Sequence, residues 1–312
     1  ATHTYASPGT YKGTISGDYP HLQLGNSTAK DKLLSVEQWG TQQWGAMNSM
    51  FAGNTKVEIH ALDVPNLENV TDMSGMFYGA TSFNQDIGDW NVSNVTNMEL
   101  MFARATSFSQ NLNDWDVSNV TNMSYMFFDA TSFNQDISNW KVSNVTDMYA
   151  MFSTATSFNQ DISNWKVSNV TDMSYMFFGA TSFNQNIGDW DVSNVTDMRY
   201  MFSGATSFNQ DISKWNVSKV TDMSFMFYEA TSFNQDLGNW IVSNVTNMSR
   251  MFFGAVLFNQ AIDNWIVSNV TDMKAMFSKA SSFEKAPLAS TRNSISFDEN
   301  SCRIDFIRLI SV

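Results

Sequence analysis

The hydrophobic and polar positions of the chain follow a pattern that repeats every 25 residues without insertion or deletion over most of its length. Within one unit, Val95, Met98, Met101, Phe102 and Ala105 are spaced by three or four residues. This spacing predicts a short helix with one buried side. A fixed period of this length is typical of a solenoid, in which each unit forms one coil and its neighbours complete its core.

Large apolar residues occupy the same register in successive units. The phenylalanine column is Phe83, Phe108, Phe133, Phe158, Phe183, Phe208, Phe233, Phe258 and Phe283. The tryptophan column is Trp90, Trp115, Trp140, Trp165, Trp190, Trp215, Trp240 and Trp265. Because equivalent residues recur in columns, function is to be sought in ladders of side chains rather than in a single pocket.

The remainder of each unit predicts a strand and a return corner. Thr96 precedes the predicted helix and is expected to be its N-cap. Residues 108–112, with the equivalents 133–137 and 158–162, predict a short strand. The Ser-Asn of each Val-Ser-Asn-Val-Thr is expected to form the corner, where side chains bond to the backbone. The predicted fold is a repeat solenoid with one short parallel β-strand and one short helix per coil and irregular capping ends.

Four segments follow from where the period begins and ends. Residues 1–32 are predicted to be an N-terminal β-rich cap or the end of a preceding domain, and residues 33–69 a degenerate first coil. Residues 70–285 form the regular solenoid, and residues 286–312 a C-terminal cap. Caps are expected because a terminal coil would otherwise expose apolar surface and unpaired backbone groups.

Composition restricts the partners. The formal charge of −13 argues against nucleic acid or an acidic membrane surface as a partner, so neutral or cationic partners are expected. No stretch approaches the roughly 20 apolar residues that span a bilayer, and any export signal is expected to lie outside this sequence. Cys302 is the only cysteine, which excludes an intrachain disulfide.

Nothing in the sequence predicts catalysis or a cofactor. His3, His21 and His60 all lie in the irregular N-terminal part, and there is no glycine-rich phosphate loop or metal-spaced His/Cys set. We therefore expect a protein that is not an enzyme and has no resident metal.

The units resemble the repeats of BspA-like leucine-rich-repeat surface proteins. Residues 155–177 read Ala-Thr-Ser-Phe-Asn-Gln-Asp-Ile-Ser-Asn-Trp-Lys-Val-Ser-Asn-Val-Thr-Asp-Met-Ser-Tyr-Met-Phe, and residues 33–53 resemble that family's first coil. The resemblance implies a leucine-rich-repeat-like solenoid in a bacterial protein that is secreted or attached to the cell surface and acts in adhesion, without catalytic residues. The chain departs from the pattern at Ser109, Ala261 and Val256-Leu257.

Asn, Gln and Asp recur along the predicted strand. The ligand-binding candidates on this face are Asn84, Gln85, Asp86, Asn134, Gln135, Asp136, Asn159, Gln160, Asp161, Asn184, Gln185, Asn209, Gln210 and Asp211. Stacked amides can bond to one another along a sheet, which is a structural role. The functional alternative is a periodic ligand such as a polysaccharide, bound by many equivalent weak sites.

Two further columns have alternative interpretations. The Asp column could bind calcium, which prefers clustered oxygen ligands, although no single coil contains a dedicated calcium loop. The Trp column could stack on sugars, but its position between inward-facing apolar residues favours burial.

An aromatic pair recurs in every second coil on the outward side of the predicted helices. The partner-contact candidates are Tyr125, Phe128, Tyr175, Phe178, Phe225 and Tyr228. Exposed aromatic residues often mark contacts, and the alternative is that each ring covers the helix of its neighbour.

These observations predict an extracellular binding or adhesion module that presents ladders to a repetitive partner, either a polysaccharide or a cell-surface protein. The alternative is a structural spacer without a ligand of its own. Ice binding by the Thr column, from Thr96 to Thr246, is a distant third interpretation.

Overall fold

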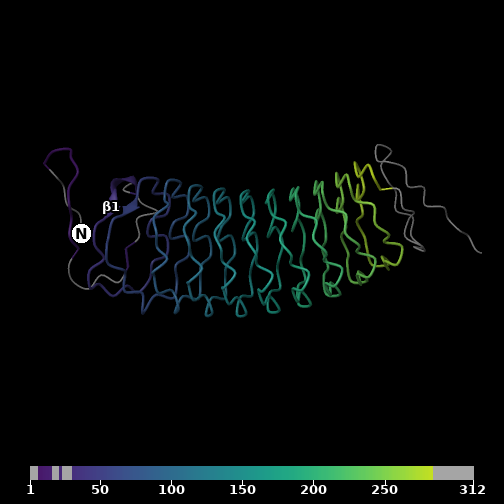
Figure 1. Cartoon of the computed structure of the whole chain (residues 1–312), viewed down its shortest axis with the longest axis horizontal. Coiled ribbons are helices and arrows are strands. Elements are labelled where there is room, and N and C mark those ends of the chain that lie inside the picture. Colours follow the sequence, from purple (N-terminus) through teal and green to yellow (C-terminus); the bar gives the residue numbers. More distant parts are fainter. Residues whose placement is uncertain (1–5, 16–20, 23–29, 284–312) are drawn as a thin grey trace, which may run out of the picture.

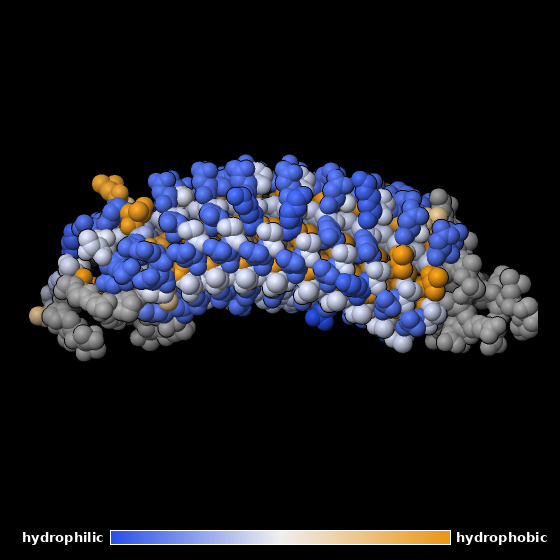
Figure 2. All heavy atoms as spheres, turned by 90° about the horizontal axis from the view of Figure 1, so that it is seen from below, coloured by the Kyte–Doolittle hydropathy of each residue, from blue (hydrophilic) through white to orange (hydrophobic). Residues whose placement is uncertain are grey.

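The chain forms a solenoid whose coils stack side by side along one long axis (Figure 1). The structure, a computed structural model, describes residues 6–15, 21–22 and 30–283. The predicted C-terminal cap at 286–312 and part of the N-terminal segment lie outside these residues. The body is elongated and bowed, and the face in Figure 2 carries polar side chains in rows along the long axis.

Regular secondary structure is confined to the first coils of the described part. A 3₁₀ helix, η1 (Lys30–Lys32), precedes two short strands, β1 (Ser35–Val36) and β2 (Glu58–Ile59). The strands pair in parallel, with Ser35 opposite Glu58. In the later coils, single parallel bridges connect one residue per coil, beginning with Asp72 to Asn97 and ending with Asn247 to Asp272.

The predicted helix in each coil is wrong. Its segment is a succession of tight turns, and alternate N–H groups cross to the carbonyls of the next coil. In one coil these crossing bonds are Met123 to Asp147 (3.1 Å), Tyr125 to Tyr149 (2.8 Å), Phe127 to Met151 (2.9 Å) and Asp129 to Ser153 (2.8 Å). The intervening N–H groups of Met126, Phe128 and Ala130 bond to carbonyls three residues back. Half of the backbone donors therefore hold the turns, and the other half hold neighbouring coils together.

Backbone conformation excludes a helix in this segment. Tyr125 and Asp129 both have φ of 56°, which is the left-handed region that a right-handed helix cannot contain. The equivalent positions in an earlier coil are glycines, Gly75 and Gly79, at φ of 57° and 67°. The helix-like spacing of apolar residues still marks the core, because Met123, Met126, Phe127 and Ala130 all point inward and are fully buried.

The predicted strand is also misplaced. No strand occurs at 108–112, 133–137 or 158–162, and the parallel bridges lie instead at the residue after each column threonine. Thr96 is therefore not a helix cap: its N–H and Oγ1 donate to the carbonyl of Thr71 at 2.9 and 3.1 Å. The predicted corner is confirmed, because Asn119 Nδ2 donates to the Ser93 carbonyl at 2.7 Å.

The core consists of aromatic columns with methionines beside them. Phe133 stacks on Phe127 with ring centroids 3.9 Å apart, and it lies 6.1 Å from Phe108 and 6.0 Å from Phe158 in the adjacent coils. The indoles are buried, as predicted: Trp140 is 3% exposed. Each indole N–H in the regular coils from Trp115 onward donates to a carbonyl of the previous coil, which is Leu112 O at 2.8 Å for Trp140. Their faces are therefore closed to a sugar ring.

We expect the change Phe158→Ala to lower the free energy of unfolding by about 3–5 kcal/mol, because it leaves a cavity between two coils. Leu257→Ala is the control, since Leu257 is 53% exposed and its loss should cost less than about 0.5 kcal/mol. Urea unfolding followed by tryptophan fluorescence measures both. Equal effects of the two changes would contradict a core built on stacked rings.

Candidate functional site

The Asn and Gln ladder is a structural device that replaces backbone bonding between coils. Asn159 Oδ1 accepts the N–H of Asn184 at 2.9 Å and Nε2 of Gln185 at 3.0 Å. Gln185 Nε2 also donates to the Asn159 carbonyl at 2.9 Å. The predicted ladder is thus present, but the Asn oxygen and the Gln nitrogen are already engaged, and both residues are half-buried.

The same bonds recur along the column. Ladder bonds leave Asn84, Asn134, Asn159, Asn184, Asn209 and Asn234, each accepted by the side-chain oxygen of that residue. Ser109 is the one departure in this run. Its hydroxyl still accepts from Asn134 N–H, but at 3.4 Å, and from Gln135 Nε2 at 3.1 Å.

The Asp column holds local turns. Asp161 Oδ1 accepts the N–H of Ser163 at 2.9 Å, and Asp86, Asp136, Asp211 and Asp236 accept the N–H two residues later in the same way. The N–H and hydroxyl of Ser163 lower the pKa of Asp161 by stabilising its carboxylate. Within the described residues, no group of three or more His, Cys, Asp or Glu side chains is placed to hold a metal ion.

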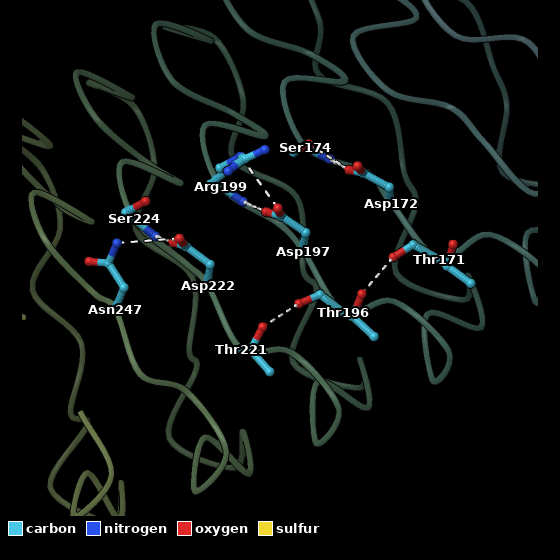
Figure 3. A network of polar contacts seen from close by, with 10 residues as sticks. All are labelled: Thr171, Asp172, Ser174, Thr196, Asp197, Arg199, Thr221, Asp222, Ser224 and Asn247. Atoms are coloured by element: carbon cyan, nitrogen blue, oxygen red, sulfur yellow. Dashed lines mark hydrogen bonds and ion pairs between the residues drawn. The ribbon is translucent and has the colours of Figure 1, made fainter. Parts of the chain in front are cut away.

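A second acidic row lies at the bridge positions (Figure 3). Asp197 Oδ1 accepts the N–H of Arg199 at 3.0 Å, and its Oδ2 lies 3.3 Å from Arg199 Nε. Burial raises the pKa of Asp197, and repulsion from Asp172 and Asp222 adds to the rise. Beside this row, Thr196 Oγ1 donates to the preceding coil's threonine carbonyl at 3.3 Å. Both rows use their donors within the fold.

The outward aromatic residues form a continuous row, which we call the aromatic stripe. Its members are Tyr125, Phe128, Tyr149, Tyr175, Phe178, Tyr200, Phe225, Tyr228 and Phe253, all half-buried. Tyr200 lies between Tyr175 and Phe225, with ring centroids 4.5 and 4.3 Å away and ring planes within 13° of parallel. Tyr228 stacks on Phe253 at 4.8 Å. The faces of Tyr200 are therefore covered by neighbouring rings.

Sequence reasoning identified six members of the aromatic stripe and missed what joins them. Tyr149 lies between Tyr125 and Tyr175, at centroid distances of 4.9 and 5.6 Å, so the stripe does not stop at every second coil. Tyr149 was missed because it occupies a register that holds serine in the coils on either side, Ser124 and Ser174. Burial raises the pKa of Tyr149, so its hydroxyl stays protonated.

Cationic side chains border the aromatic stripe. Arg104 Cζ lies 6.0 Å from the ring centroid of Tyr78 and 5.8 Å from that of Phe128. Arg250 Cζ lies 5.2 Å from Phe225, which continues the stack, and Lys279 Nζ lies 5.0 Å from Phe253. These distances are those of cation–π contacts. The chain has few basic residues, and several of them are placed on this stripe.

A hollow of about 270 Å³ interrupts the aromatic stripe. Its walls are the rings of Phe178, Tyr200, Phe225 and Tyr228. Its remaining lining is Gly179, Ser203, Gly204 and Glu229. The hollow exists because Ser203 occupies the register that holds Phe178 one coil earlier and Tyr228 one coil later. A small side chain between two rings leaves a gap two coils wide.

Comparison with known proteins shows the family. The family described as "Mycoplasma protein of unknown function, DUF285" matches residues 25–128, 110–205 and 182–291, and the chain belongs to it. No curated protein matches the chain. The narrower resemblance to BspA-like surface proteins stays a prediction.

One similar solved structure is a leucine-rich-repeat receptor, "Crystal structure of TLR13-ssRNA13 complex". It is 9% identical, with a TM-score of 0.26, over 79% of this chain and 47% of that one. This chain therefore spans about half the length of that structure. The likeness is distant, and nothing about the ligand of that protein is carried over.

We expect Asn159→Ala to lower the free energy of unfolding by about 1–3 kcal/mol, because it leaves the half-buried N–H of Asn184 without an acceptor. Asp161→Asn is the matched control: its side-chain oxygen can still accept from Ser163, so stability should change by less than about 0.5 kcal/mol. Chemical denaturation of both variants measures the difference. An unaffected Asn159→Ala would mean that the ladder does not hold the coils together.

We expect Asp197→Asn to be more stable than the parent chain at neutral pH. A raised pKa in the folded state means that the ionised carboxylate is destabilising, a penalty that is present above that pKa and disappears as the pH falls through it. The advantage of the variant should therefore shrink between about pH 7 and about pH 4. Urea unfolding at both pH values tests this. A less stable variant at neutral pH would show that the contact with Arg199 outweighs burial.

Proposed function

We propose that the chain is a binding module of the adhesion type, and that its contact surface is the aromatic stripe. The observation that carries this proposal is the hollow between Phe178 and Tyr228, in a row of aromatic rings that reach the surface. Contiguous exposed apolar surface bordered by polar groups is typical of interaction sites. The partner we propose is a polymer of a cell surface, either protein or glycan.

Packing alone does not account for the rings of the aromatic stripe. The coil with Ala150 and Ser153 at the registers of Tyr125 and Phe128 has the same turns and the same crossing bonds, such as Ala150 N–H to Ser174 O at 3.0 Å. Small side chains are thus sufficient for the coil to form. Aromatic residues at these registers leave apolar surface in water that the fold does not require, which favours a role in binding.

The strand-face ladder is the weaker candidate surface. Its amides already bond to one another, so a glycan would have to compete for the same groups or bind the groups left over. This internal bonding is the observation that favours the alternative, a structural spacer whose only contacts are at its ends.

The location of the protein is also a proposal. We propose that it acts outside the cell, in keeping with an adhesion role and with the resemblance of its repeats. Within the described residues, no helix is long and apolar enough to cross a membrane. Calcium bound by the exposed oxygens of the Asp column is a further possibility that the same binding experiment can include.

We expect the double change Tyr175→Ala and Phe178→Ser to keep the fold and to reduce partner binding at least about tenfold, because central aromatic residues dominate interface energetics. The variant copies the chain's own Ala150 and Ser153 coil, so a folding defect is not expected. Binding is measured on arrays of glycans and of extracellular proteins, with and without calcium.

The matched control removes exposed apolar residues elsewhere. Ile241 and Ile266 are 61% and 65% exposed, and the equivalent residue one coil before Ile241 is Asn216. Changing both isoleucines to Asn should leave binding intact. Binding that survives the double aromatic change but is lost in Asn159→Ala would place the site on the strand face. Absence of any array ligand would favour the spacer.

A further inference from the structure

The hollow at Ser203 has an occupied counterpart within the same chain. Four coils of 25 residues earlier, 100 positions away, the equivalents of Phe178, Gly179, Phe225 and Tyr228 are Tyr78, Gly79, Tyr125 and Phe128. The acid is retained as well, since Glu229 corresponds to Asp129. The main difference is at one position, where the hollow has Gly204 and the earlier coil has Arg104.

Arg104 shows what this arrangement binds. Its guanidinium carbon lies 6.0 Å from one ring centroid and 5.8 Å from the other, so it fills the gap between two rings that are two coils apart. Lys279 follows the same rule, with its Nζ 5.0 Å from the ring of Phe253. In both cases the cation belongs to the residue 26 positions after the ring. That residue is Gly204 for Phe178, and it has no side chain to place there.

Electrostatics at the hollow favour a cation. Across the described part of the chain, basic groups lie over the rings of Tyr78, Phe128, Phe225 and Phe253, and none lies over Phe178 or Tyr228. Glu229 lines the hollow and supplies a carboxylate. The formal charge of the whole chain is −13, which attracts basic partners over a longer range.

We propose that the hollow receives an arginine side chain of a partner protein, which inserts between Phe178 and Tyr228 beside Glu229 as Arg104 does between its own rings. Coils about 4.8 Å apart separate rings two coils apart by about 10 Å, so a cation midway is about 5 Å from each ring. Guanidinium is favoured over ammonium because it is planar, stacks on aromatic faces and is less strongly hydrated. This assignment rests on the proposed function and names the chemistry of its partner.

The test uses the whole chain, isotope-labelled on its Phe and Tyr rings, and two probes: ethylguanidinium and an acetylated Gly-Arg-Gly amide. Both probes should shift the NMR signals of Phe178 and Tyr228 and saturate. A peptide with citrulline, the neutral isostere of arginine, should bind about tenfold more weakly. Glu229→Gln should weaken the arginine peptide without changing the citrulline peptide.

Gly204→Arg is the decisive variant, since it fills the hollow with the chain's own guanidinium and should abolish both responses. The fold tolerates the change, because Arg104 has φ of 59° above Gly79, and a Cβ on Gly204 (φ of 70°) would meet Gly179 Cα at 3.5 Å, an ordinary contact. Thr154→Arg is the matched control: it adds the same charge at the same register one gap away and should leave binding intact.

Arg104→Gly calibrates the experiment. This change opens the earlier gap, so ethylguanidinium should now also shift the ring signals of Tyr78 and Phe128. Uptake there without uptake at Phe178 and Tyr228 would overturn the proposal. So would tetramethylammonium binding as tightly as ethylguanidinium, or Gly204→Arg binding the arginine peptide unchanged. If Gly204→Arg keeps the array partner that Tyr175→Ala with Phe178→Ser loses, the stripe is the binding surface and the arginine assignment is wrong.

Discussion

The structure depends on the division of backbone donors between a coil and its neighbour. In each turn segment, one N–H closes a turn within the coil and the next crosses to a carbonyl of the following coil, as for Phe128 and Phe127. A helix would use every donor internally and leave the coils joined only by side chains. Alternation requires the left-handed backbone at registers such as Tyr125 and Asp129, and the crossing bonds offset that strain.

On the opposite side of the coil, side chains perform the task that backbone carbonyls perform in a sheet. Asn159 Oδ1 takes the N–H of the next coil, and the following Gln covers the same oxygen. The indole N–H groups and the corner asparagines add one bond each between coils. The fold therefore has three sets of polar ladders around an aromatic core. Because these ladders use their own donors and acceptors, little polar capacity is left for a ligand.

The aromatic stripe differs from the ladders because the coils form without it. Its registers accept glycine, alanine, serine, arginine and tyrosine, and the crossing bonds are the same in each case. Residue choice at these registers is free of the packing constraint that fixes the Phe and Trp columns. A gap opens wherever a small residue lies between two rings, and the residue one position later decides whether the gap is filled, as by Arg104, or left open, as at Gly204.

The sequence by itself determined the solenoid, the length of its coil, the buried Phe, Trp and Met columns and the corner asparagines, because each depends on a period that is written in the chain. It did not determine the local backbone, since turns that alternate in handedness bury the same three- and four-residue spacing as a helix. Only the tertiary structure showed that Thr96 bonds to the previous coil, that Asn159 replaces a strand, and that Tyr149 makes the aromatic stripe continuous. Each of these depends on contacts between residues about 25 positions apart, and a pattern read along one coil does not contain the position of the next.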